Sequence, residues 1–299
     1  MATPLAAQTT SGVQPRFFFS GDGTLELANA HFPERLRVRY RNADGSYDAE
    51  ALAQIARFFR SRSDGRSGPL SLRLIELIDF VQDRDPSITW TLVSGYRSPD
   101  FNSALRSKGR RVAQASLHTE GLAADLQPSG GDLQHLWLSL RELQVGGVGL
   151  YQAEGFIHLD TGRPRFWEAA TSGVDKNLSA GNARAFARTD FDRYADLRGA
   201  VITLHSVTAL PIRIGQRAHI GDVAVMLAPV DASVRLTDGC FVIDDPGAQR
   251  AFTVTTSIAP PAGRAPIRLS TCGPRIGATP REIMTNEIER QDATPAKSG

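Results

Sequence analysis

Two short stretches of the chain hold most of the side chains that could do chemistry together. Residues 116–125 include His118 and Asp125, and residues 155–162 include His158 and Asp160. Zinc in a hydrolytic site takes three protein nitrogen or oxygen ligands and leaves one position for water. His118, Asp125 and His158 would provide such a set. Their single carboxylate would leave positive charge on the metal, which lowers the pKa of a bound water.

The spacing of these residues is compatible with a common site. Gly121 permits a sharp turn between His118 and a strand that carries Asp125. In a strand through Ile157, alternate side chains share a face, so Glu154, His158 and Asp160 would point the same way. The same spacing also permits an interpretation without metal. His118 would then cap a turn, and His158 would be a hydrogen-bonded core histidine.

The elements that must position these residues alternate between helix and strand patterns. Period-two and β-branched runs predict strands, and apolar spacing of three and four predicts helices. We expect strands near 36–40, 88–93, 122–127, 147–151 and 155–160, and helices near 48–59, 71–84, 99–107 and 132–143. This mixture predicts an α+β domain, a small antiparallel sheet with flanking helices, at residues 25–170.

The second half of the chain has a different composition. A Ser-, Gly- and Asn-rich stretch predicts a linker over residues 171–190. Strand-like runs at 201–204, 219–227, 234–237, 240–243, 251–258 and 267–270 then predict a small all-β domain over 191–273. Asp238-Gly239 is a hairpin signal between two of these runs. Residues 1–24, of which the first ten are small and polar, and the polar residues 274–299 are expected to be flexible.

Composition limits the classes of function. Of 299 residues, 41% are hydrophobic and 22% charged, which are globular values, and the net charge of +2 gives no electrostatic reason to expect nucleic acid as a partner. No apolar run is long enough to predict a membrane span. Residues 5–8 resemble those around a signal-peptidase cut, so one hypothesis is a secreted protein whose leader has been removed. An ordinary disordered N-terminus is the alternative.

Several motifs in order along the chain resemble a known enzyme family. They are Ser94-Gly95-Tyr96-Arg97-Ser98 with Asn102, Ser116-x-His118-x-x-Gly121-x-Ala123-x-Asp125, Gly147-Val148-Gly149-x-Tyr151 and Phe156-x-His158-x-Asp160-Thr161-Gly162. Together they are similar to the murein endopeptidase branch of the D-Ala-D-Ala-carboxypeptidase and hedgehog-like (LAS-type) zinc peptidases. The resemblance covers about Leu25 to Trp167.

The resemblance implies a zinc metallopeptidase of the bacterial periplasm or cell envelope that hydrolyses peptide bonds in peptidoglycan. One zinc ion per chain would be held by His118, Asp125 and His158. Tyr96, Arg97 and Ser116 would contact the substrate, and Arg97 would also stabilise an oxyanion or bind a carboxylate. From the residues alone, Arg97 could equally tie the end of a strand to the next helix, and Ser116 could be a turn hydroxyl.

The general base is not assigned by the resemblance. Many relatives carry an acidic residue three positions before the last ligand histidine, and here that position is Gly155. Strand parity makes Glu154 and Asp160 the candidates, and we favour Asp160 because Thr161-Gly162 can turn it toward the metal. Alternatively, Asp160 fixes the tautomer of a ligand histidine or binds Arg163.

Two other classes of function remain open at this point. Without an acid at Gly155, the chain could be a zinc-containing binding or scaffolding module of the cell wall that has no turnover. The β domain could instead be the functional part.

The remaining motifs give smaller expectations. We expect a disulfide between Cys240 and Cys272, both of which fall in the β domain, and we expect the histidines at 31, 135, 205 and 219 to be structural or exposed. The basic loop at 108–111 is either a solvated charge run or a contact for anionic carboxylates.

Overall fold

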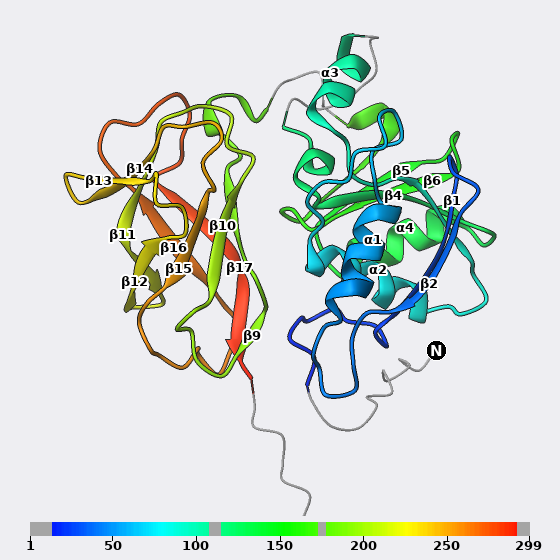
Figure 1. The fold of residues 1–299 in the computed structure, drawn as a ribbon, viewed down its shortest axis with the longest axis horizontal. Coiled ribbons are helices and arrows are strands. Elements are labelled where there is room, and N and C mark those ends of the chain that lie inside the picture. Colours follow the sequence, from blue (N-terminus) through cyan, green and yellow to red (C-terminus); the bar gives the residue numbers. More distant parts are fainter. Residues whose placement is uncertain (1–13, 108–114, 173–177, 292–299) are drawn as a thin grey trace, which may run out of the picture.

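The computed structural model describes residues 14–107, 115–172 and 178–291, and the basic loop at 108–111 lies outside them. Two sheets organise the chain into two lobes, one with helices and one built of strands (Figure 1). The protein is therefore a mixed α+β structure. None of the helices within the described residues combines the length and the apolar character that a membrane crossing needs.

The first sheet has seven strands in the order β2-β1-β3-β4-β6-β5-β7. Their bounds are β1 Thr24–Asn29, β2 Arg35–Arg39, β3 Trp90–Ser94, β4 Ala123–Pro128, β5 Gly147–Tyr151, β6 Phe156–Asp160 and β7 Arg165–Glu168. The expectation of an antiparallel sheet is wrong for two pairs, because β1 runs parallel to β3 and β5 parallel to β7. The first parallel pair is possible because two helices lie between β2 and β3 and return the chain to the same end of the sheet.

Four α-helices in the described residues accompany this sheet: α1 Ala49–Phe58, α2 Leu72–Asp83, α3 Pro99–Ser107 and α4 Leu133–Glu142. Asp48 and Asp132 cap α1 and α4 by accepting hydrogen bonds from backbone N–H groups of the first turn. Helices α1, α2 and α4 contact β2, β1 and β5 respectively, and their apolar faces close the core. This packing fixes the central strands β4 and β6, which carry two of the predicted ligands.

The second sheet contains ten strands in residues 186–290, and the described residues from 178 onward include no α-helix. Their bounds are β8 Phe186–Thr189, β9 Arg193–Tyr194, β10 Val201–His205, β11 Ile212–Ile220, β12 Val223–Pro229, β13 Arg235–Thr237, β14 Cys240–Ile243, β15 Ala251–Val254, β16 Ala265–Thr271 and β17 Glu282–Arg290. The hairpin predicted at Asp238-Gly239 is present between β13 and β14. The run at 219–227 is not one strand, because Gly221 takes a positive φ and turns the chain between β11 and β12.

Three predicted flexible segments are partly ordered, which corrects the expected boundaries. Strand β17 occupies the expected C-terminal tail, and its Ile283 and Ile288 are fully buried. Strand β8 lies inside the expected linker and pairs with β10. At the N-terminus Phe17 is buried, and Phe18 N donates a hydrogen bond to Asp192. Burial of these apolar side chains stabilises segments whose polar composition had predicted disorder.

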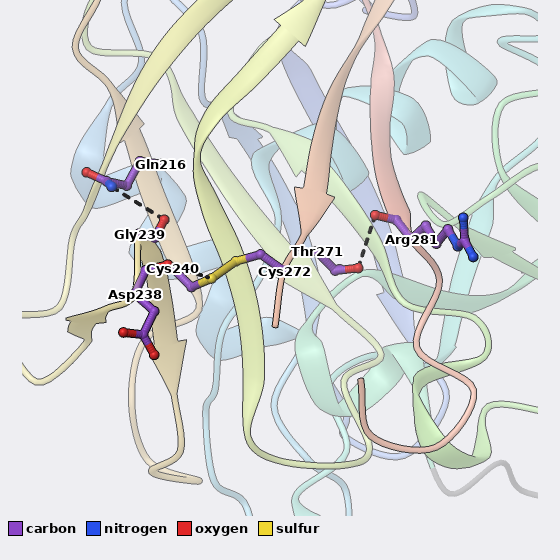
Figure 2. Close-up of a disulfide and its surroundings, with 7 residues drawn as sticks. All are labelled: Gln216, Asp238, Gly239, Cys240, Thr271, Cys272 and Arg281. Atoms are coloured by element: carbon purple, nitrogen blue, oxygen red, sulfur yellow. Dashed lines mark hydrogen bonds between the residues drawn. A yellow bond between two sulfur atoms is a disulfide. The ribbon is translucent and has the colours of Figure 1, made fainter. Parts of the chain in front are cut away.

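The expected disulfide between Cys240 and Cys272 is present (Figure 2). Cys240 begins β14 and Cys272 follows β16, and both of these strands pair with β11. The disulfide therefore links the two neighbours of one central strand across 32 residues of sequence.

Candidate metal centre

His118 lies in a short 3-10 helix, Leu117–Glu120, that ends at Gly121. Gly121 has a φ of 68°, and a Cβ at this position would lie 1.9 Å from the carbonyl oxygen of Pro69. Only glycine fits such a close approach in a left-handed conformation. This turn sends the chain directly into β4, and so it brings His118 next to the strand that carries Asp125.

Asp125 and His158 are placed by the register of the sheet. They are cross-strand partners on β4 and β6. The row of cross-strand partners that contains this pair continues to Ser94 of β3 on one side. On the other side it continues to Gly149 of β5 and Trp167 of β7. Because paired residues project to the same face of a sheet, both ligand candidates point to the side where His118 lies.

The structure brings these three side chains into one cluster. One possible ligand atom from each of His118, Asp125 and His158 lies within 4.8 Å of the others. His158 Nδ1 is 2.9 Å from Asp125 Oδ1 and 3.2 Å from His118 Nε2, and His118 Nε2 is 3.3 Å from Asp125 Oδ1. All three residues are buried.

A separate partner holds the outer atom of each of these residues. His118 Nδ1 lies 2.8 Å from the carbonyl oxygen of Gly95, and His158 Nε2 lies 2.8 Å from Asp160 Oδ2. A carbonyl and a carboxylate only accept, so these ring nitrogens carry the hydrogens and donate. Arg97 Nη2 donates to the outer oxygen of Asp125 at 2.6 Å.

These outer hydrogen bonds direct three lone pairs toward one point. With hydrogens on the outer nitrogens, neutral His118 and His158 present unprotonated Nε2 and Nδ1 to Asp125 Oδ1. Three buried acceptors in contact without a donor repel one another. A cation between them would relieve this, and two imidazoles with one carboxylate form a donor set that zinc accepts. The residues present therefore fit a zinc ion.

The electrostatic environment acts differently on the members of the cluster. Burial, reinforced by the positive charge of Arg97, lowers the pKa of His118 to about 4. Burial opposes the charged form of His158 as well, but the hydrogen bonds that a protonated ring would donate to Asp125 and Asp160 outweigh burial and raise its pKa. The pKa of Asp125 is well below its usual value because His118 and Arg97 outweigh the effect of burial.

The position of Asp160 favours the alternative role, in which it supports His158, over the role of general base. Asp160 is fully buried on the side of His158 that faces away from the cluster. Its oxygens accept hydrogen bonds from Arg165 and from the backbone N–H groups of Gly147 and Gly162. The carboxylate therefore orients His158 and fixes its tautomer. Its ion-pair partner is Arg165, not Arg163.

Glu154 does not share the face of His158. It is exposed in the turn between β5 and β6, and β6 begins only at Phe156. Gly155 has a φ of 75° and forms part of this turn, so the alternation assumed for residues 154–160 does not extend to Glu154. Among the described residues, Asp125 is therefore the single carboxylate in the cluster.

The three predicted substrate contacts have different surroundings. Arg97 bridges Asp125 and the hydroxyl of Ser94, which is a supporting position beside the cluster. The ring of Tyr96 packs on Gly68, where a Cβ would lie 2.2 Å from the ring. Ser116 is buried just before the 3-10 helix, and its carbonyl oxygen accepts from Thr119. The other four histidines lie outside the cluster.

Sequence reasoning missed the aromatic and basic residues that β7 contributes. The indole of Trp167 lies over Gly149, with its ring centre 5.2 Å from that of His158, and its Nε1 donates to the hydroxyl of Tyr151 at 3.3 Å. Exposure alternates along this strand, with Arg165 and Trp167 partly buried and Phe166 between them exposed. This two-residue period is the signal that could have predicted the strand. Trp167 is partly buried and forms a wall beside the cluster.

Comparison with known proteins gives one consistent result. Residues 20–167 match the family of peptidoglycan L,D-endopeptidase MepK. The peptidoglycan L,D-endopeptidase MepK of Escherichia coli strain K12 is 33% identical over 171 residues, which is 56% of this chain and 87% of that protein. The probable peptidoglycan L,D-endopeptidase MepK of Haemophilus influenzae is 40% identical over 148 residues, 48% of this chain and 78% of that protein. No solved structure matches the chain.

Proposed function

Because the chain belongs to the family of peptidoglycan L,D-endopeptidase MepK, we propose that it is a zinc-dependent peptidoglycan hydrolase that cleaves a peptide bond in stem or cross-link peptides. The family match covers the sheet and helices of the first lobe, so we assign the peptidase domain to residues 25–170. The reaction then takes place in the cell envelope, where its substrate is found. The β-rich region after residue 185 lies outside the matched segment.

The observation that carries this proposal is the convergence of three buried lone pairs from His118, Asp125 and His158. One zinc ion per chain would be held by these atoms. When bound, zinc would supply Lewis acidity for the scissile carbonyl and for activation of the attacking water.

The chain's own residues prepare and limit this site. Gly95 and Asp160 fix the tautomers of the two histidines, so that each presents a lone pair inward. Arg97 holds the outer oxygen of Asp125 and keeps this carboxylate ionised despite its burial. Trp167, held by Tyr151, covers one side of the cluster and offers a flat apolar surface against which a peptide substrate can lie.

Two measurements on purified protein test the proposal: bound metal and cleavage of cross-linked muropeptides, each with and without a chelator. We expect one zinc per chain and cleavage that the chelator abolishes and added zinc restores. His118→Ala and His158→Ala should lose both metal and activity, because two remaining ligands hold the ion weakly. His135→Ala, a matched change at an exposed helix position, should lose neither. Normal zinc content in both ligand variants would overturn the ligand assignment.

A second candidate function rests on the absence of another carboxylate in the cluster among the described residues, together with Gly155 at the position where many relatives carry an acid. These features fit a zinc-containing module that binds the cell wall without turnover. The same assay separates the two. A chain that holds zinc and binds muropeptides but leaves them intact would support the second function.

A further inference from the structure

The β-rich region contacts the turn that carries the first ligand candidate. Glu120 is the last residue of the 3-10 helix that contains His118. Its carboxylate accepts a hydrogen bond from Ser206 N at 3.1 Å, and its other oxygen lies 2.7 Å from His205 Nδ1 at the end of β10. Ser206 has a φ of 56°, which is uncommon for a residue with a side chain. The backbone of the β-rich region is thus held in an unusual conformation at the contact with this turn.

The same region also holds the turn behind the other histidine. Arg188, a half-buried residue of β8, donates from Nε to the carbonyl oxygen of Thr161 at 2.6 Å and from Nη2 to that of Gly162 at 2.5 Å. Gly162 N in turn donates to Asp160 Oδ1 at 2.8 Å, and Asp160 accepts from His158. A continuous chain of hydrogen bonds therefore runs from β8 to the ring of His158.

An apolar contact also joins the two regions. Leu117, Leu122 and Ala123 from the peptidase side form one buried cluster with Phe186 of β8. The ring of Phe186 also lies 5.3 Å from that of His205. Glu120 and Arg188 are both partly buried beside this contact, so loss of a hydrogen-bonding partner would leave a polar group with reduced access to water.

We propose that the β-rich region positions the candidate metal centre, with Glu120 and Arg188 as positioning residues. Glu120 would fix the 3-10 helix of His118, and Arg188 would fix the turn that holds Asp160 against His158. A region that served only as a tether or as a wall-binding module would have no need to contact both turns. The inference rests on the proposed function where it treats the cluster as a zinc site, but the contacts themselves do not depend on it.

Variants of the full chain test this positioning role. We expect Glu120→Ala and Arg188→Leu to weaken zinc binding about tenfold, as loss of a partner behind a metal ligand does. Both should lower kcat for muropeptide cleavage and leave KM unchanged, because substrate contacts are untouched. Glu120→Gln should recover most of the loss, since its amide oxygen can still accept from Ser206 N. Chelator competition and steady-state kinetics provide these values.

A matched control separates positioning from docking of the two regions. Arg73 of α2 binds Asp192 and donates to the carbonyl oxygen of Thr189 at 3.0 Å, but it contacts neither ligand turn. Arg73→Gln therefore removes an arginine contact between the regions and should leave zinc affinity and kcat unchanged. If Arg73→Gln and the two positioning variants lose zinc affinity equally, docking alone accounts for the effect and the proposal is wrong.

Hydrogen exchange in the metal-free protein keeps the test independent of the proposed function. The amides of Leu122 and Gly162 donate within the two turns, to Leu117 O and Asp160 Oδ1. We expect them to exchange at least tenfold faster in Glu120→Ala and Arg188→Leu than in wild type or Arg73→Gln. If Arg188→Leu does not fold, the comparison of Glu120→Ala with Glu120→Gln tests the positioning role. Unchanged exchange at both amides would overturn the positioning role, whereas a wild-type chain without zinc or activity would overturn only the proposed function.

Discussion

Replacing Asp160 by Asn tests how the orientation of His158 is set. In the wild type, His158 Nε2–H donates a hydrogen bond to the carboxylate of Asp160. Asn keeps one acceptor oxygen, but in the variant its NH2 group faces the ring. The ring must then either lose this hydrogen bond or move its hydrogen to Nδ1, the atom that faces Asp125. Loss of one charge-assisted hydrogen bond costs about 2 kcal/mol. This corresponds to about 30-fold weaker zinc binding, since each 1.4 kcal/mol is a factor of ten.

Zinc affinity of Asp160→Asn is measured by chelator competition at constant pH, next to turnover at saturating zinc. Asp100→Asn is the control, because Asp100 is also an aspartate paired with an arginine but is exposed. We expect weaker zinc binding in Asp160→Asn and turnover that largely returns when zinc is in excess. Wild-type zinc affinity with turnover reduced 100-fold would refute this reasoning and restore Asp160 as the general base.

Three further perturbations have defined outcomes. Gly121→Ala should destabilise the fold by about 2 kcal/mol or more in urea unfolding, because its Cβ would overlap the carbonyl oxygen of Pro69 at a positive φ. Reducing the disulfide between Cys240 and Cys272 should cost about 3 to 4 kcal/mol, the loop-closure value for 32 residues, and should lower the melting temperature of the β-rich region. Burial raises the pKa of Asp79 from 3.8 to about 8, so the folded state holds a proton that the unfolded state releases. The contribution of Asp79 to the free energy of unfolding is therefore complete below pH 4 and is lost as the pH rises to 8. We expect the melting temperature of the wild type to fall over this pH range. In Asp79→Asn, which cannot titrate at this position, the fall should be smaller.

The clustering of His118, Asp125 and His158 could be predicted because its signals are local. His118 and Asp125 lie on either side of one glycine turn, and His158 lies in a strand whose parity is clear. The sequence left two roles open for Asp160, because the choice between them depends on Arg165 in a four-residue strand without a strong pattern. Parity alone placed Asp160 on the face of His158 but could not say which ring nitrogen it would meet.

The C-terminal strand escaped prediction for a different physical reason. In β17 the buried residues Ile283 and Ile288 are five positions apart, which does not fit simple alternation. The pairing with β16 is irregular between Pro266 and Arg268, and this bulge reverses the face of the strand partway along it. A period-two search therefore detects two short fragments in place of one strand of nine residues.

The pairing of Asp125 with His158 makes metal binding a reporter of strand register during folding. A slip of one residue between β4 and β6 would turn one of these side chains to the opposite face of the sheet and separate the pair. Zinc would then bind only chains whose central strands have found the native alignment. A metal ion present during folding would stabilise that alignment by mass action over every shifted alternative. The same three side chains that would serve catalysis in the mature protein would thus select the correct sheet as it forms.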